Sequence, residues 1–176
     1  MAAAPALKVV GLDLSLNRTG IATAAGAESL VPPSQLDGFP RMRWIRAGVR
    51  DWTNDADLVI VEAPAFSSNG KYAKEIAGLW HVVMIAIDAR GVRWFDVMSS
   101  SLKKYATGKG TKVGKDEMVI AAVKRLPIEV TNNDEADAAW LCAFGHDLLG
   151  QPLVGLPHAH RAALDTPRVR FARGDA

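Results

Sequence analysis

An acidic residue within the most apolar stretch of the chain limits what this sequence can fold into. Residues 7–16 form a nearly continuous apolar run, which predicts a buried β-strand. In a strand, side chains alternate between two faces, so Asp13 shares a face with Val9 and Gly11. A lone buried carboxylate is unfavourable unless it is paired or binds a cation. Asp13 therefore either bonds to backbone amides of the turn at 17–20 or belongs to a site, and the strand alone does not decide between them.

The hydrophobic pattern after this strand predicts a β-hairpin followed by strands that alternate with helices. We expect further strands at 21–25, 28–31, 58–61 and 92–97, and helices at 40–52, 71–89, 99–107, 115–125 and 133–149. This order is typical of an α/β domain with a mixed sheet, antiparallel at first and parallel later, flanked by helices. On the first predicted helix, Arg43, Arg46 and Arg50 share a face distinct from the apolar one.

The length and composition fit one globular domain. The chain has 176 residues, of which 49% are hydrophobic, enough for a full core. We assign residues 1–150 to this domain and residues 151–176 to a basic, proline-containing tail that we expect to be extended or disordered. The single cysteine, Cys142, cannot form a disulfide within the chain, and we find neither a signal peptide nor an apolar span of about 20 residues. We therefore expect a soluble cytoplasmic protein. The net charge of +2 says little about partners.

Three further carboxylates lie at the ends of predicted elements. Glu62 directly follows the fourth predicted strand, at the carboxyl end where open α/β sheets commonly place ligands. Asp134 and Asp137 are three residues apart at the start of a helix and project from one face. Each signal has a structural alternative: Glu62 can mark the strand's exit into solvent, and Asp134 can complement the helix dipole. Glu135 can partner a capping Asn132. These alternatives explain Asp137 less well.

Taken together, the four carboxylates predict a site for divalent cations. Two strands and one helix start would each bring a carboxylate to the edge of the core, where mutual repulsion raises pKa values. A hard divalent cation removes that penalty, and carboxylate oxygens together with retained waters are the ligands that Mg²⁺ prefers. Two such ions roughly 4 Å apart are a known arrangement for in-line attack on a phosphodiester bond. The acids therefore favour hydrolysis of nucleic acid.

Four segments carry motifs whose order and spacing are more specific than any one motif alone. They are 11–15 (Gly-Leu-Asp-Leu-Ser) with Asn17, Thr19-Gly20 and Ile21-Ala22; 59–62 (Val-Ile-Val-Glu); the lysine- and glycine-rich 102–110 with Lys115 and Met118; and 134–138 (Asp-Glu-Ala-Asp-Ala). In this order they resemble the motifs of the RuvC-type Holliday-junction resolvase family, within the RNase H-like superfamily. The resemblance covers roughly residues 7–149 and fits a bacterial or phage member. It implies an RNase H-like fold with a five-stranded mixed sheet flanked by helices.

The resemblance also implies an activity and an assembly. The chain would be an endonuclease that resolves four-way and other branched DNA as a homodimer, leaving 5′-phosphate and 3′-hydroxyl ends. The catalytic, metal-binding carboxylates would be Asp13, Glu62, Asp134 and Asp137, which would hold two Mg²⁺ ions, with Mn²⁺ as a substitute. The helix at 71–89 would supply the dimer contact through an apolar arc, for which core packing within one chain is an equal explanation. That arc consists of Ile76, Leu79, Trp80, Val83 and Ile87.

A basic segment lies between the second and last motifs. Its candidate DNA contacts are Lys103, Lys104, Lys109, Lys112 and Lys115. Lysines suit a phosphate backbone, while junction selectivity would come from DNA shape. The loop at 108–115 is about one residue longer than the family's usual form, so whether Lys112 or Lys115 is the equivalent lysine stays open. Phe66 is the candidate for the family's aromatic wedge into the junction, with ordinary packing as the alternative.

Three alternative functions remain. An RNase H-like nuclease for flaps, forks or RNA-containing duplexes would share these carboxylates, because substrate choice depends on loops and on dimer geometry. A non-catalytic DNA-binding relative would bind DNA without metal-dependent cleavage. The first motif also resembles a phosphate loop of the actin and sugar-kinase superfamily, but this chain is too short for the two domains that such proteins need.

Overall fold

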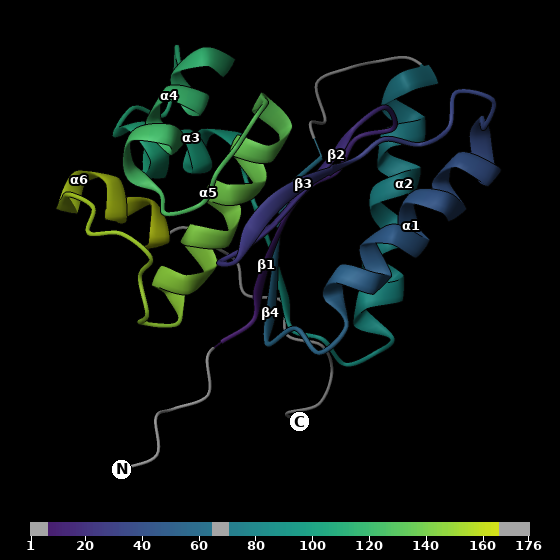
Figure 1. Cartoon of the computed structure of the whole chain (residues 1–176), viewed down its shortest axis with the longest axis horizontal. Coiled ribbons are helices and arrows are strands. Elements are labelled where there is room, and N and C mark those ends of the chain that lie inside the picture. The colour runs from purple at the N-terminus through teal and green to yellow at the C-terminus, as the bar shows by residue number, and fades with distance from the viewer. Residues whose placement is uncertain (1–6, 65–70, 166–176) are drawn as a thin grey trace.

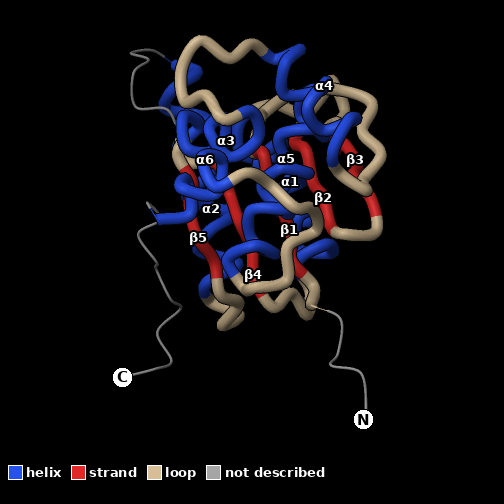
Figure 2. The backbone as a smooth tube through the Cα atoms, turned by 90° about the vertical axis from the view of Figure 1, so that its left-hand side faces the viewer, coloured by secondary structure: helices blue, strands red, loops and turns tan. Residues whose placement is uncertain are grey.

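The structure, a computed structural model, describes residues 7–64 and 71–165. The described strands form a five-stranded sheet in the order β3-β2-β1-β4-β5 (Figures 1 and 2). They are β1 (Val9–Asp13), β2 (Thr19–Thr23), β3 (Gly26–Leu30), β4 (Leu58–Glu62) and β5 (Trp94–Val97). The pairs β1–β2 and β2–β3 are antiparallel, whereas β1–β4 and β4–β5 are parallel. The predicted mixed sheet, antiparallel at first and parallel later, is confirmed.

Helices cover both faces of this sheet, as Figure 1 shows. One face carries α1 (Gly38–Thr53) and α2 (Lys71–Asp88). The other carries α3 (Ser99–Thr107), α4 (Lys115–Arg125), α5 (Asn133–Leu148) and the short α6 (His158–Arg161), which is followed by a 3-10 turn (Ala162–Asp165). A hydrophobic cluster fills each interface between helices and sheet. Within the described ranges, no helix is long and apolar enough to cross a membrane.

The two central strands send alternate side chains into the two cores. Val9, Leu58 and Ile60 belong to the cluster around α5, and Val10, Leu12, Val59 and Val61 belong to the cluster around α1 and α2. Asp13 and Glu62 also face α5. Side chains alternate along a strand, and Asp13 lies four residues after Val9 while Glu62 lies two residues after Ile60. Leu12 pairs with Val61 in the parallel register. The two carboxylates therefore follow on neighbouring strands, at the same edge and on the same face of the sheet.

The close approach of α5 to the sheet depends on two glycines. A Cβ on Gly11 would lie 2.0 Å from the carbonyl oxygen of Ala138, and one on Gly20 would lie 2.0 Å from that of Asp134. A larger residue at either position would push the helix away, because both obstructing atoms are backbone. Glu135, Ala136 and most of the helix up to Asp147 are consequently buried. The first turn of α5 is thereby held against the ends of β1 and β2.

The apolar arc of α2 packs inside its own chain. Leu79, Trp80, Val83 and Ile87 are buried in the core between α2 and the sheet, with Ile76 packed against them. Of the two explanations for this arc, core packing within one chain is therefore confirmed, and a dimer contact through the helix stays a prediction. A dimer contact through α2 would need its outer side, where His81 and Ile85 are exposed.

The predicted tail also differs from expectation. Residues 158–165 are helical and pack against α3 rather than being extended. Arg161 donates two hydrogen bonds, of 3.0 and 2.7 Å, to the buried carboxylate of Asp147. That carboxylate also accepts a hydrogen bond of 3.1 Å from the hydroxyl of Tyr105 on α3. These contacts join residues far apart in the sequence, so local composition did not reveal them. Residues 166–176 lie outside the described residues.

Candidate functional site

Four carboxylates meet at one edge of the sheet. Asp13 ends β1 and Glu62 ends β4, while Asp134 and Asp137 lie in the first two turns of α5. Asp13 interacts electrostatically with the other three carboxylates. The structure thus brings together all four residues that the sequence singled out, from two strands and one helix.

Asp13 is the most buried of these acids. Its pKa is raised well above the usual range, first by burial and then by the negative charges of its carboxylate neighbours. The structural alternative, that Asp13 bonds to the turn at 17–20, is not what the structure shows. Polar groups of that turn are satisfied locally, since Thr19 donates to the carbonyl of Ser15 at 2.8 Å and Asn17 donates its amide to the hydroxyl of Ser15 at 3.3 Å. Desolvation without such bonds is the condition under which a carboxylate favours a cation.

Glu62 is held by groups from two neighbouring helices. Burial raises its pKa, while a hydrogen bond from Ser99 and the charge of Lys103 oppose that rise. Its backbone carbonyl accepts a hydrogen bond of 3.2 Å from the indole Nε1 of Trp80 on α2. Ser99 is the first residue of α3, and its nearness to Glu62 depends on the parallel pairing of β4 and β5, so the sequence alone does not reveal it.

Asp137 has a buried carboxylate oxygen that lacks a hydrogen-bond partner among the described residues. Burial raises its pKa to about 7, and the charges of Glu62 and Asp134 add to this effect. Its Oδ1 atom is buried and has no hydrogen-bond partner among the described residues. A buried carboxylate oxygen without a partner is costly, so this atom points to a missing ligand.

The other acids of the first turn of α5 have structural partners. Glu135 accepts hydrogen bonds from the backbone and hydroxyl of Thr131, at 2.8 and 2.7 Å, and from the hydroxyl of Ser29 at 2.8 Å. These bonds outweigh its burial and lower its pKa. Asp134 accepts a hydrogen bond of 2.8 Å from the side-chain amide of Asn133. Its Oδ2 atom also lies 4.0 Å from Nε of Arg18. The structural explanation therefore fits Glu135 best and Asp137 least.

The donor set suits a hard divalent cation, although the carboxylates do not form a closed ligand set. Between residues 7–64 and 71–165, no group of three Asp, Glu, His or Cys side chains is arranged to hold an ion. The acids nevertheless repel one another across a desolvated edge, and Asp137 has an orphaned oxygen. Carboxylate oxygens are the ligands that Mg²⁺ and Mn²⁺ take. The residues present thus fit a divalent cation, whose positive charge would relieve both features.

Two of the five predicted DNA-contacting lysines lie beside the acids. Lys103 on α3 lowers the pKa of Glu62 and Asp137, and Lys115 at the start of α4 lowers that of Asp13 and Asp137. Of the loop lysines, Lys109 and Lys112 are exposed, and Lys104 on α3 is half-buried. Phe66, the predicted wedge, lies outside the described residues.

A pocket of about 170 Å³ opens beside the two strand carboxylates. Besides Asp13 and Glu62 it is lined by Leu14, Ala63, Pro64, Tyr72, Ile76 and Trp80. Tyr72 is 55% exposed although it is large and aromatic. Tyr72 could not be singled out from the sequence, because it precedes the strongly periodic part of α2.

Comparison with known proteins supports the fold. No protein-family model matches the sequence, and no curated protein matches it. Among solved structures, Thermus thermophilus RuvC matches with a TM-score of 0.64 and 18% identity, over 85% of this chain and 100% of that one. A structure of T. thermophilus RuvC in complex with a Holliday junction substrate matches with the same TM-score and coverages at 16% identity. The chain therefore has a RuvC-type, RNase H-like fold.

Proposed function

We propose that this protein is a divalent-metal-dependent endonuclease that cuts branched DNA, with the four-way junction as its main substrate. The observation that carries this proposal is the convergence of Asp13, Glu62, Asp134 and Asp137, with the unpartnered Oδ1 of Asp137 among them. The RuvC-type fold adds support, since one of the similar structures is of a RuvC bound to a Holliday junction.

The four carboxylates would hold two Mg²⁺ or Mn²⁺ ions. When bound, the ions would supply charge neutralisation at the scissile phosphate and lower the pKa of the attacking water. The protein's own contribution is position and charge. Ser99 and the backbone contact from Trp80 fix Glu62, and the packing of α5 on the two strand glycines fixes Asp137. Hydrolysis at this site would leave 5′-phosphate and 3′-hydroxyl ends.

The lysines next to the acids would hold the substrate's backbone. Lys103 and Lys115 place positive charge beside a strongly acidic site, which DNA could not otherwise approach against electrostatic repulsion. The loop lysines Lys109 and Lys112 are exposed in the segment that joins α3 to α4. We assign all of them, with Lys104, to contacts with phosphates.

Cutting both strands of a junction symmetrically would require two sites, and so a homodimer. The exposed His81 and Ile85 on the outer side of α2 are the residues through which this helix could meet a second copy. The second candidate function uses the same chemistry on flaps or forks, because the carboxylates alone do not select among branched substrates.

A substrate panel tests the proposal. The protein would be incubated with a four-way junction, a fork, a flap and a linear duplex of matched sequence, each with Mg²⁺, Mn²⁺ or EDTA. We expect paired nicks at symmetric positions on the junction, dependent on metal. Cleavage spread evenly over forks and flaps would favour the second candidate. Tight junction binding without cleavage in any metal would refute nuclease activity.

A further inference from the structure

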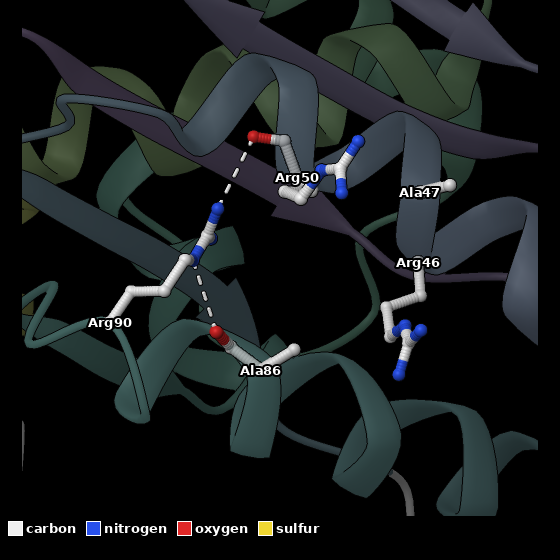
Figure 3. Close-up of a pocket in the computed structure, with 5 residues that line it drawn as sticks. All are labelled: Arg46, Ala47, Arg50, Ala86 and Arg90. Carbon is white, nitrogen blue, oxygen red and sulfur yellow. Dashed lines mark hydrogen bonds between the residues drawn. The ribbon is translucent and has the colours of Figure 1, made fainter.

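Three arginines gather in a pocket on the face of the sheet opposite α5. The pocket, of about 200 Å³, lies between α1 and the end of α2 and is lined by Arg46, Ala47, Arg50, Ala86 and Arg90 (Figure 3). No carboxylate lines it. It is separate from the candidate metal site, whose residues come from β1, β4 and α5.

Arg90 forms the fixed positive wall of this pocket. Its guanidinium donates to the carbonyl oxygens of Ala86 and Arg50, at 3.1 and 3.4 Å, and to the side chains of Asn54 and Thr53, at 3.1 and 2.7 Å. Four of its five N–H donors are thus used to tie the last turns of α1 and α2 together. Burial and the charge of Arg50 both lower its pKa, so positive charge is crowded here.

The other two arginines have few partners within the protein. Arg46 has no hydrogen bond or ion pair among the described residues, and its side chain extends toward α2 in Figure 3. Arg50 reaches only Asp51, at 3.5 Å, and both side chains are more than 60% exposed. Asp88, the last residue of α2, accepts a hydrogen bond from the indole of Trp94. Two guanidinium groups are therefore available to an external anion.

These arginines belong to a row that leads away from the candidate metal site. Arg43, Arg46 and Arg50 are spaced by three and four residues and are exposed on one face of α1. At the other end of the helix, Arg41 donates a hydrogen bond of 3.2 Å to the side-chain oxygen of Asn17. Asn17 lies in the turn that follows β1, whose last residue is Asp13. The nine helical steps from Arg41 to Arg50 span about 14 Å, or roughly four base-pair steps of DNA.

We propose that Arg43, Arg46 and Arg50, together with the pocket wall at Arg90, form a second contact surface for the sugar–phosphate backbone of a duplex arm that leaves the candidate site. We call this surface the α1 track. It rests on the proposed function, because it takes DNA as the ligand. Guanidinium groups suit phosphate oxygens geometrically, and backbone contacts need no base sequence. A lone bound anion would need only the pocket, whereas the regular row along the helix fits a chain of phosphates.

Salt-dependent DNA binding tests the α1 track without requiring catalysis. Binding to a four-way junction with long arms would be measured by fluorescence anisotropy in EDTA, from low to moderate salt. The variant is Arg46→Ala/Arg50→Ala, whose residues are exposed, so folding should persist and would be checked by its melting temperature. The control is Lys124→Ala/Arg125→Ala, which removes the same charge from the exposed end of α4.

We expect the α1 variant to reduce the slope of log K against log salt by about 1.8, which is 0.9 for each of two lost phosphate contacts, and to weaken binding at least fivefold at about 0.1 M salt. The control variant should change both the salt slope and the affinity by less than the α1 variant does. Equal effects of variant and control would reduce the result to net charge and overturn the track. An unchanged α1 variant, beside a Lys103→Ala variant that loses affinity, would overturn the track while leaving the proposed function standing. If the unaltered protein bound no DNA, both proposals would fail.

Discussion

Replacing Asp137 by asparagine should stabilise the metal-free protein while abolishing cleavage. The pKa of Asp137 rises from 3.8 to about 7 on folding, roughly three units, or up to about 4 kcal/mol at 1.36 kcal/mol per unit. Because the folded pKa is the higher one, the folded state binds more protons between about pH 4 and 7, and stability is lost as the pH rises through that window. Above pH 7 the full cost of an ionised, buried carboxylate is present.

Urea unfolding in EDTA at several pH values measures this cost. The advantage of Asp137→Asn over the unaltered protein should be small near pH 4, grow up to about pH 7 and then level off. At pH 8 it would correspond to a melting temperature higher by roughly 10 °C. Added Mg²⁺ should narrow the gap, since an ion that binds the folded state stabilises only the protein that keeps the carboxylate.

The matched control is Asp116→Asn, which removes an exposed carboxylate from the start of α4. It should show no comparable pH-dependent gain. An advantage of Asp137→Asn that is constant with pH, or a variant that is less stable at pH 8 in EDTA, would refute the reasoning that this carboxylate is held at a cost for metal binding.

Three further predictions follow from single contacts. Gly11→Ala should destabilise the protein by several kcal/mol in urea unfolding, because its Cβ would meet the carbonyl of Ala138 at 2.0 Å; normal stability would show that α5 can move aside. Tyr105→Phe should cost about 1–3 kcal/mol by removing a hydroxyl donor from the buried Asp147, and a neutral result would mean that Asp147 finds another partner. Lys103→Ala should weaken junction binding and flatten its salt dependence, and an unchanged slope would remove this lysine from the DNA surface.

The sheet could be predicted from the sequence because strand patterns are local. The apolar runs around Val10 and Ile60 mark two of the strands, and the turn after the first strand predicts the hairpin; the structure has strands at both runs and pairs β1 with β2. Asp13 and Glu62 were found for the same reason: a charge that interrupts or ends a buried strand is visible without knowing its neighbours. Asp137 followed from its three-residue spacing to Asp134.

What the sequence could not show depends on contacts between distant segments. The apolar arc of α2 has the same pattern whether it faces a partner or the sheet, and only the fold showed that Val83 is in the core. The helical turn around Arg161 is held by Asp147 and Tyr105, which no local composition reveals. The hydrogen bond of Ser99 to Glu62 likewise depends on the pairing of β4 with β5.

The most direct test of the central claim is cleavage of a labelled four-way junction by the unaltered protein and by Asp13→Asn, side by side with binding of both to the same junction. The account predicts metal-dependent nicks from the unaltered protein, none from the variant, and nearly equal junction affinity for the two. Normal cleavage by Asp13→Asn would contradict the account, because the most buried carboxylate of the proposed site would then have no part in the reaction.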